Sequence, residues 1–153
     1  MDDTLQTEQD LLLATDIGKL LNDHNGGDVV VMDMRSLNFW TDFFVIATTT
    51  SSTHLRGLER HIKEFARQKE VDILHRSRRP KSNVEQQPDE WCLLDMGTIV
   101  IHLMSSKVRS FFELERLWSA APVIRVEGLI PKNSLREGGS AAYKVLNQNT
   151  NTL

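Results

Sequence analysis

The stretch from Trp91 to Met104 constrains the fold most, because it predicts an antiparallel hairpin with two different faces. Gly97-Thr98 suits a two-residue turn with glycine in its first position. Such a turn places Met96 opposite Ile99 and extends the pairing outward to Trp91 opposite Met104. One face then carries only apolar side chains, which are Cys92, Leu94, Met96, Ile99, Ile101 and Leu103. We expect this face to form core.

The opposite face of the hairpin is mixed and carries Trp91, Leu93, Asp95, Val100, His102 and Met104. Aromatic and methionine side chains with a few polar groups are the composition of a protein-binding surface. A core face that tolerates one histidine fits the same residues, because most large apolar side chains in strands are buried. The hairpin alone leaves both interpretations open.

The segment after the hairpin predicts one amphipathic helix. Ser105-Ser106 offers an N-cap, and the residues that recur at helical spacing are Val108, Phe111, Leu114, Glu115 and Trp118. We expect the aromatic side chains of this helix to pack on the sheet. Arg109, Glu113 and Arg116 fall on the opposite side, which predicts a solvated stripe of ion pairs.

Upstream of the hairpin, the apolar pattern predicts two helices and three strands. Residues 43–46 form a continuous apolar run, which is typical of a strand buried on both faces. Ser51 or Ser52 caps the next helix, whose apolar face carries Leu55, Leu58, Ile62 and Phe65. We expect the first helix over about 7–24, ended by Gly26-Gly27, and strands over 28–34, 42–48 and 71–74.

This order of elements predicts a mixed sheet with helices packed on it, in a single α/β domain. The 153 residues, of which 40% are hydrophobic, suffice for one core. The single cysteine, Cys92, excludes an internal disulfide framework and a cysteine-rich zinc site. We expect residues 1–120 to form the domain and residues 121–153 a C-terminal extension whose last dozen residues are mobile.

Two motifs resemble the family of Iojap-related ribosomal silencing factors. The first runs from Trp91 to Trp118 and includes Asp95, Gly97, His102, Arg109 and the closing Leu114-Glu115-Arg116-Leu117-Trp118. The second is Thr41-Asp42-Phe43-Phe44-Val45-Ile46-Ala47, followed by Thr50-Ser51-Ser52 and His54. The resemblance covers roughly residues 10 to 120. Thr49, Thr53 and Thr98 depart from the usual glycine, arginine and acidic residue, which affects contacts at two turns more than the fold.

The resemblance implies a five-stranded mixed sheet whose topology is related to that of nucleotidyltransferases, without their catalytic residues. It also implies a translation repressor that binds the large ribosomal subunit through its fourteenth protein and sterically blocks the small subunit. We expect contacts to this partner from the mixed face and the hairpin tip, by Trp91, Asp95, Met96, His102 and Met104. In this hypothesis Trp91 is the apolar anchor and Asp95 pairs with a basic residue of the partner.

Charge is unevenly distributed along the chain, although the net charge is only −3. Residues 1–42 hold nine acids and two basic side chains, whereas residues 56–81 hold nine basic side chains and four acids. The basic set includes Arg56, Arg60, Lys63 and Arg67 at helical spacing, then Arg76, Arg78, Arg79 and Lys81. These residues predict either a contact to ribosomal RNA phosphates or a solvated helix face and a solubilising loop.

Enzymatic interpretations are weaker. Asp95 and His102 share a hairpin face but lie diagonally apart, and no nucleophile or phosphate loop accompanies them. His54 and His61 lack a third metal ligand, and we expect His54 to fix the cap of its helix. We therefore predict a protein without catalytic activity, metal or cofactor. The alternatives are a nucleotide-handling enzyme on a nucleotidyltransferase-like fold and an RNA-binding module acting through residues 56–81.

The sequence also predicts where the protein acts. No apolar stretch is long enough to span a bilayer, and Met1-Asp2-Asp3 is not the basic start of a targeting segment. We expect a cytoplasmic protein with no membrane partner. A free mixed face could also support a homodimer in the absence of the ribosome.

Overall fold

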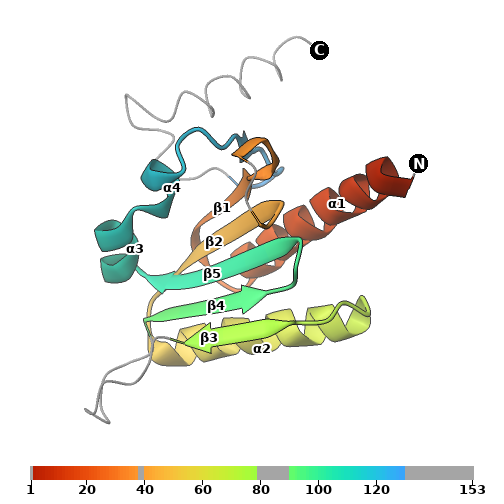
Figure 1. Cartoon of the computed structure of the whole chain (residues 1–153). Helices are drawn as coiled ribbons and strands as arrows, with labels where there is room; N and C mark the ends of the chain where they lie inside the picture. The colour runs from red at the N-terminus through yellow and green to blue at the C-terminus, as the bar shows by residue number, and fades with distance from the viewer. Residues whose placement is uncertain (1, 38–39, 79–89, 130–153) are drawn as a thin grey trace.

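The computed structural model describes residues 2–37, 40–78 and 90–129, which form one mixed α/β sheet structure (Figure 1). The sheet order is β3-β4-β5-β2-β1-β6; β2 and β5 are parallel, and the other pairs are antiparallel. The strands are β1 (Gly27–Asp33), β2 (Phe43–Thr49), β3 (His75–Arg78), β4 (Trp91–Asp95), β5 (Ile99–Ser105) and β6 (Val123–Ile124). The helices are α1 (Asp2–Asp23), α2 (Ser52–Gln68), α3 (Ser106–Phe112) and α4 (Leu114–Leu117), with a 3-10 turn at Arg35–Leu37. The predicted α/β class is confirmed, and β6 adds a sixth strand to the five that the resemblance implied.

The hairpin of β4 and β5 has the predicted register, from Trp91 opposite Met104 to Asp95 opposite Val100. Gly97 has φ +88°, a conformation that glycine adopts without steric cost. The Asp95 carboxylate also closes the turn, because its Oδ1 accepts a hydrogen bond of 2.7 Å from the Gly97 N–H. The turn residues therefore determine which side chains share a face.

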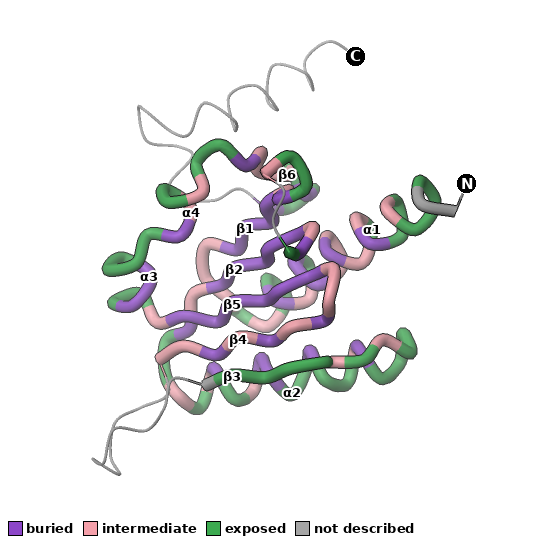
Figure 2. Tube along the Cα trace, in the orientation of Figure 1, coloured by how far each residue is buried: buried purple, intermediate pink, exposed green. Residues whose placement is uncertain are grey.

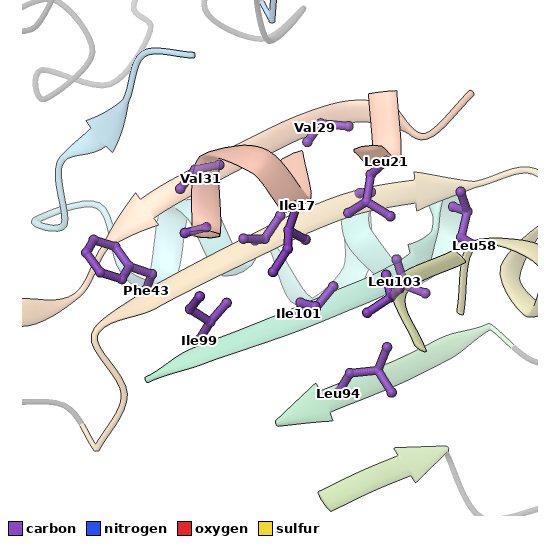
Figure 3. Close-up of a cluster of buried hydrophobic side chains, with 14 of the residues drawn as sticks. Ile17, Leu21, Val29, Val31, Phe43, Leu58, Leu94, Ile99, Ile101 and Leu103 are labelled. Atoms are coloured by element: carbon purple, nitrogen blue, oxygen red, sulfur yellow. The ribbon is translucent and has the colours of Figure 1, made fainter. Parts of the chain in front are cut away.

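Both faces of the central strands are buried, as the apolar run in β2 predicts. Helices α1 and α2 cover one face, where the core includes Ile17, Leu21, Val45, Leu58, Ile101 and Leu103 (Figure 3). The second core lies on the opposite face and includes Val30, Met32, Phe44, Ile46, Val100 and Met104. Alternate residues of β2 and β5 thus enter different cores. The predicted core face of the hairpin belongs entirely to the first of them.

Helix α2 begins as its sequence predicts, because the side chain of Ser51 accepts a hydrogen bond from the N–H of His54 at 3.0 Å. The predicted strand over 71–74 is wrong, since the edge strand β3 is His75–Arg78. The described side chains of β3 are exposed and polar, so no apolar pattern marks the strand. It is held by pairing with β4 and by an ion pair between Arg76 and the buried carboxylate of Glu59 on α2.

The single helix predicted after β5 is wrong. Ser105 caps α3 as expected, but Glu113 adopts a left-handed conformation with φ 45° and separates α3 from α4. Arg109, which was predicted in a solvated stripe, is buried, and Phe111, which was predicted to pack on the sheet, is 81% exposed. The error has a physical reason, because a left-handed glutamate carries no sequence signal of the kind that glycine provides.

The first part of the predicted C-terminal extension packs on the domain. Val123 and Ile124 of β6 pair with Met32 and Val31 of β1. Ala121, Val126 and Leu129 are buried (Figure 2). The dozen terminal residues that we expect to be mobile lie outside the described residues, as does most of the loop between β3 and β4.

Two glycine substitutions test the turn assignment. Gly97→Ala should lower the free energy of unfolding by about 1 kcal/mol, because alanine is strained at positive φ. Its added Cβ would also approach Leu74 Cδ1 at 3.3 Å. Gly57→Ala should raise the same free energy by about 0.5–1 kcal/mol, since Gly57 lies inside α2 and an added Cβ would enter open space. If urea unfolding gave the same change in the free energy of unfolding for both variants, the positive φ assigned to Gly97 in the turn would be contradicted.

Candidate protein-binding face

The outer face of β4 presents Trp91, Leu93 and Asp95, all partly exposed. Figure 1 shows α2 behind β3 and β4, with no helix of the described ranges in front of them. Cross-strand pairing places His75 opposite Asp95 and Ser77 opposite Leu93, so polar side chains of β3 border this face. We call Trp91, Leu93 and Asp95 the β4 face. It is a strip of sheet with apolar side chains that the chain itself leaves partly uncovered.

The five residues predicted to bind a partner separate into two groups. Trp91 and Asp95 lie on the β4 face, where a partner could touch them. Met96, His102 and Met104 are buried, with 7%, 5% and 0% of their surface exposed. Met96 belongs to the core beneath α1 and α2, and Met104 to the core beneath α3. Direct contact of these three side chains with a partner stays a prediction, and it would require a rearrangement.

Trp91 is held at its position by two other aromatic rings. Its indole Nε1–H donates a hydrogen bond of 3.3 Å to Nδ1 of His102 on the adjacent strand. Its ring also contacts Phe112 of α3, with 4.9 Å between centroids and 50° between planes. His102 lies on β5 and Phe112 on α3, so the position of the Trp91 ring depends on how these two elements pack beside β4.

Phe111 and Phe112 extend the apolar surface beyond the sheet. Their rings touch each other edge to face at 4.9 Å, and Phe112 bridges to Trp91. We call Trp91, Phe111 and Phe112 the aromatic rim. Sequence reasoning missed the two phenylalanines as surface residues, because helical periodicity assigned Phe111 to the buried side of one continuous helix. In the structure α3 ends at Phe112, and Phe111 and Phe112 are 81% and 38% exposed.

Arg109 fixes α3 relative to the sheet. Its Nε donates to Glu115 Oε1 at 2.7 Å, and its Nη1 donates to the Gly27 carbonyl at 3.2 Å and to Thr48 Oγ1 at 2.8 Å. One side chain therefore joins α3, α4, β1 and β2. Because Arg109 is 7% exposed, these charge-assisted bonds are shielded from solvent. They hold the helix that carries the rim.

His102 sits in an apolar environment between Phe44 and Trp91. Its ring meets Phe44 edge on at 4.8 Å between centroids. Burial lowers the pKa of His102 to about 4 from the ordinary 6.5, so the ring is neutral near pH 7. Nδ1 accepts from Trp91, which puts the proton on Nε2. This second nitrogen is buried without a hydrogen-bond partner in the described part of the chain.

Other candidate sites have structural roles in the described residues. The Asp95 carboxylate accepts a hydrogen bond from the Gly97 N–H in the turn, and His102 is buried. The two side chains therefore do not form an acid-base pair that a substrate could reach. His54 fixes its cap as predicted, accepting from the Thr50 N–H at Nδ1 and reaching the His24 carbonyl with Nε2. His61 stacks on His24 at 3.6 Å. The described ranges contain no cluster of three His, Cys, Asp or Glu residues that could hold a metal.

A polar cleft of about 420 Å³ lies beside Arg109. Its lining includes Glu113 and Glu115, but each of these carboxylates already pairs with an arginine, Arg116 and Arg109 respectively. Asp28 also lines the cleft, so its lining holds three acids and two arginines, and both arginines are engaged in these ion pairs.

The basic residues are partly neutralised within the chain. Arg56, Arg60, Lys63 and Arg67 lie on the exposed side of α2, as predicted. Lys63 and Arg76 both pair with Glu59, and Arg67 pairs with Glu64. The side chain of Arg78, and Arg79 and Lys81 altogether, lie outside the described residues. A contact to ribosomal RNA from this region stays a prediction.

Taken together, these observations define a small α/β protein with a partly exposed strip of apolar side chains on one face of its mixed sheet. A sequence model of the family described as "Ribosomal silencing factor during starvation" matches residues 6–151. The chain therefore belongs to this family, and the resemblance is confirmed. The family's description is regulatory, not catalytic. No helix in the described ranges has the length and apolar character needed to span a bilayer.

Individual relatives agree with this assignment. The ribosomal silencing factor RsfS of Treponema pallidum is 34% identical over 112 residues, which cover 73% of this chain and 95% of the relative. An Arabidopsis thaliana protein named Iojap-related, mitochondrial, is 33% identical over 111 residues, 72% of this chain. The chain spans 59% of that plant protein and 46% of the chloroplastic Iojap protein of the same plant.

Solved structures share the fold. A crystal structure of a Chromobacterium violaceum protein aligns with a TM-score of 0.56 and 27% identity, over 69% of this chain and 85% of that one. A Bacillus halodurans structure aligns with a TM-score of 0.58 over 77% and 99% of the two chains. At 24% identity, the second comparison shows the fold alone.

Burial of His102 predicts a pH-dependent stability. The folded-state pKa of about 4 lies below the ordinary 6.5. The free energy of unfolding is therefore unaffected by protonation of His102 above pH 6.5, and it decreases as the pH falls from 6.5 toward 4. The loss should be of order 3 kcal/mol in the free energy of unfolding. His102→Leu should lack this component. Urea unfolding of both proteins between about pH 7 and about pH 4.5 measures it, and parallel pH profiles would contradict the assignment.

Paired arginine substitutions test the role of Arg109. Arg109→Met should lower the free energy of unfolding by about 3 kcal/mol, because it leaves Glu115, Thr48 and the Gly27 carbonyl without their shared donor. Arg116→Met is the matched control, since the Arg116 side chain is 83% exposed and pairs with Glu113 at 3.4 Å. It should change stability by less than about 0.5 kcal/mol. Similar losses for both variants in thermal unfolding would show that Arg109 is not a special anchor.

Proposed function

We propose that this protein is a ribosomal silencing factor without catalytic activity, which binds the large ribosomal subunit and prevents the small subunit from joining. Its partner is the fourteenth protein of the large subunit, on the intersubunit face. Blocking is steric, because a domain of this size bound there would occupy space that the small subunit needs. Translation falls without a chemical step, and the protein acts in the cytoplasm where the subunits meet.

The observation that carries this proposal is the partly uncovered β4 face with its aromatic rim. Phe111 is 81% exposed and contacts Phe112, which in turn contacts Trp91. Tryptophan is among the side chains that most often dominate binding energy in protein interfaces, and phenylalanine is enriched in them. Family membership supports a ribosomal partner, and the exposed aromatic side chains support a protein surface as the part of the ribosome that is bound.

Each residue of the proposed interface has a distinct part. Trp91 supplies the apolar anchor, with Leu93 beside it on the same face. Asp95 marks the acidic end of the face and pairs with a basic residue of the partner. Phe111 and Phe112 widen the contact from the sheet onto α3. Met96, His102 and Met104 support this surface from the interior, unless binding rearranges them.

Weaker contacts could accompany the main one. The exposed side of α2 carries Arg56 and Arg60, which could approach ribosomal RNA. The free protein could also cover the β4 face with a second copy, which would dissociate on the ribosome. Neither contact is needed for steric blocking.

Sedimentation with separated ribosomal subunits tests the proposal. The wild-type protein should co-migrate with large subunits and reduce the joined ribosomes that form when small subunits are added last. Trp91→Ala should weaken binding by about 2 kcal/mol, or roughly thirtyfold, because a central aromatic anchor is lost. Trp40→Ala is the matched control, since Trp40 is 61% exposed and precedes β2 at the opposite end of the sheet.

The outcomes separate the possibilities. Loss of binding in Trp91→Ala alone supports the β4 face as the interface. Equal binding by a folded Trp91→Ala protein would remove this face from the proposal. No co-migration of the wild-type protein would contradict large-subunit binding and would direct attention to a thermal-shift screen with nucleotides and divalent metals.

A further inference from the structure

His102 occupies a position where an apolar side chain would cost less. It is 5% exposed and sits on β5 between Val100 and Met104, both of which are fully buried. Its Nε2–H is buried without a hydrogen-bond partner in the described part of the chain. A buried donor left unpaired typically costs about 1–3 kcal/mol. The histidine therefore does not serve stability at this site.

The polar contact that His102 does make is directed at the β4 face. Its Nδ1 accepts the hydrogen bond of the Trp91 indole at 3.3 Å. Strand pairing places His102 opposite Leu93 and Met104 opposite Trp91, so the indole leans diagonally across the strand to reach the imidazole. The two rings are tilted at 45° with 6.0 Å between centroids, which is not a stacking arrangement. The hydrogen bond thus determines the direction of the indole more than ring packing with His102 does.

A tryptophan at a partly exposed strand position could otherwise adopt several rotamers. Contact with Phe112 restrains one side of the ring, but a ring contact of 4.9 Å tolerates sliding and rotation. A hydrogen bond from Nε1 defines which edge of the indole faces the interior. An anchor that is already oriented loses less conformational entropy on binding than a mobile one.

We propose that His102 is a positioning residue, which holds the Trp91 indole in its binding orientation through the hydrogen bond from Nε1 to Nδ1 and does not itself touch the partner. This inference rests on the proposed function, since it assigns His102 a role in the docking of Trp91 on the large subunit. It differs from direct contact, because the imidazole acts from beneath the surface.

Two substitutions at His102 separate positioning from stability. His102→Leu fills a similar volume and removes both the acceptor and the unpaired Nε2–H. It should fold with equal or greater stability at neutral pH, yet bind large subunits about fivefold more weakly, as loss of one hydrogen bond implies. His102→Asn retains an acceptor near the place of Nδ1 but fills the site poorly. It should be less stable than His102→Leu and bind more tightly.

A double-mutant cycle tests whether His102 acts through Trp91. Trp91→Phe removes the indole N–H and keeps an aromatic ring. In that background His102→Leu should change binding to isolated large subunits by less than about twofold, compared with about fivefold in the parent. The Trp91 indole N–H resonance, identified by its absence in Trp91→Phe, should shift and exchange faster with solvent in His102→Leu.

Each result decides the question. Positioning is supported if His102→Leu is the more stable variant, His102→Asn binds large subunits more tightly, and the effects of the Trp91 and His102 substitutions on binding are non-additive. An additive cycle, unchanged binding by His102→Leu, or an unaltered indole resonance would overturn it while leaving the β4 face intact. Failure of the wild-type protein to bind large subunits would instead overturn the proposed function and this inference together, and that outcome is recognised before any variant is compared.

Discussion

The parallel pairing of β2 with β5 is the interaction on which the remaining structure depends. Seven residues of each strand are in register, from Phe43 beside Ile99 to Thr49 beside Ser105. Because both strands are apolar on both faces, each face needs its own cover. Helices α1 and α2 cover one face, and α3 with the segments around Leu114 and Ala121 covers the other. The second cover is smaller; it buries the residues of β5 and covers Trp91 and Leu93 of β4 only in part.

The β4 face follows from this unequal cover. Strand β4 pairs with β5, so its inward residues share the large core. Its outward residues Trp91 and Leu93 lie at the margin of the second core, where Trp91 contacts Phe112 of α3 and stays partly exposed. A complete cover would bury Trp91 and Leu93 and leave no apolar surface for a partner. The same geometry explains why Met104 and Val100 of β5 are buried, although they share a face with Trp91 and Leu93 in the hairpin pattern.

Polar interactions in the interior place the surface features. Arg109 connects α3 to β1, β2 and α4, and the left-handed Glu113 lets α3 stop where Phe111 and Phe112 point outward. His102 links Trp91 to the sheet at the expense of an unpaired buried nitrogen. A protein selected for stability alone would replace His102 by an apolar side chain of similar size, which would remove the unpaired buried nitrogen. The presence of this histidine is consistent with a surface whose geometry matters.

The sequence by itself determined the elements that depend on local pattern. The turn at Gly97, the hairpin register, the cap at Ser51 and the two-faced burial of β2 all follow from spacing and turn chemistry, because these interactions are made between residues near one another or directly paired. The motifs around Trp91 and Thr41 also sufficed to recognise the family.

The tertiary structure alone decided which candidate residues reach the surface. Periodicity placed Phe111 inside and Arg109 outside, and the structure reverses both. Acceptors on β1, β2 and α4 hold the guanidinium of Arg109 in the interior. The edge strand β3 is polar, and β6, although both of its residues are apolar, is too short to show a period; both strands depend on partners across the sheet. Burial is a property of what packs above a residue, and a sequence pattern records only which side of its own element the residue occupies.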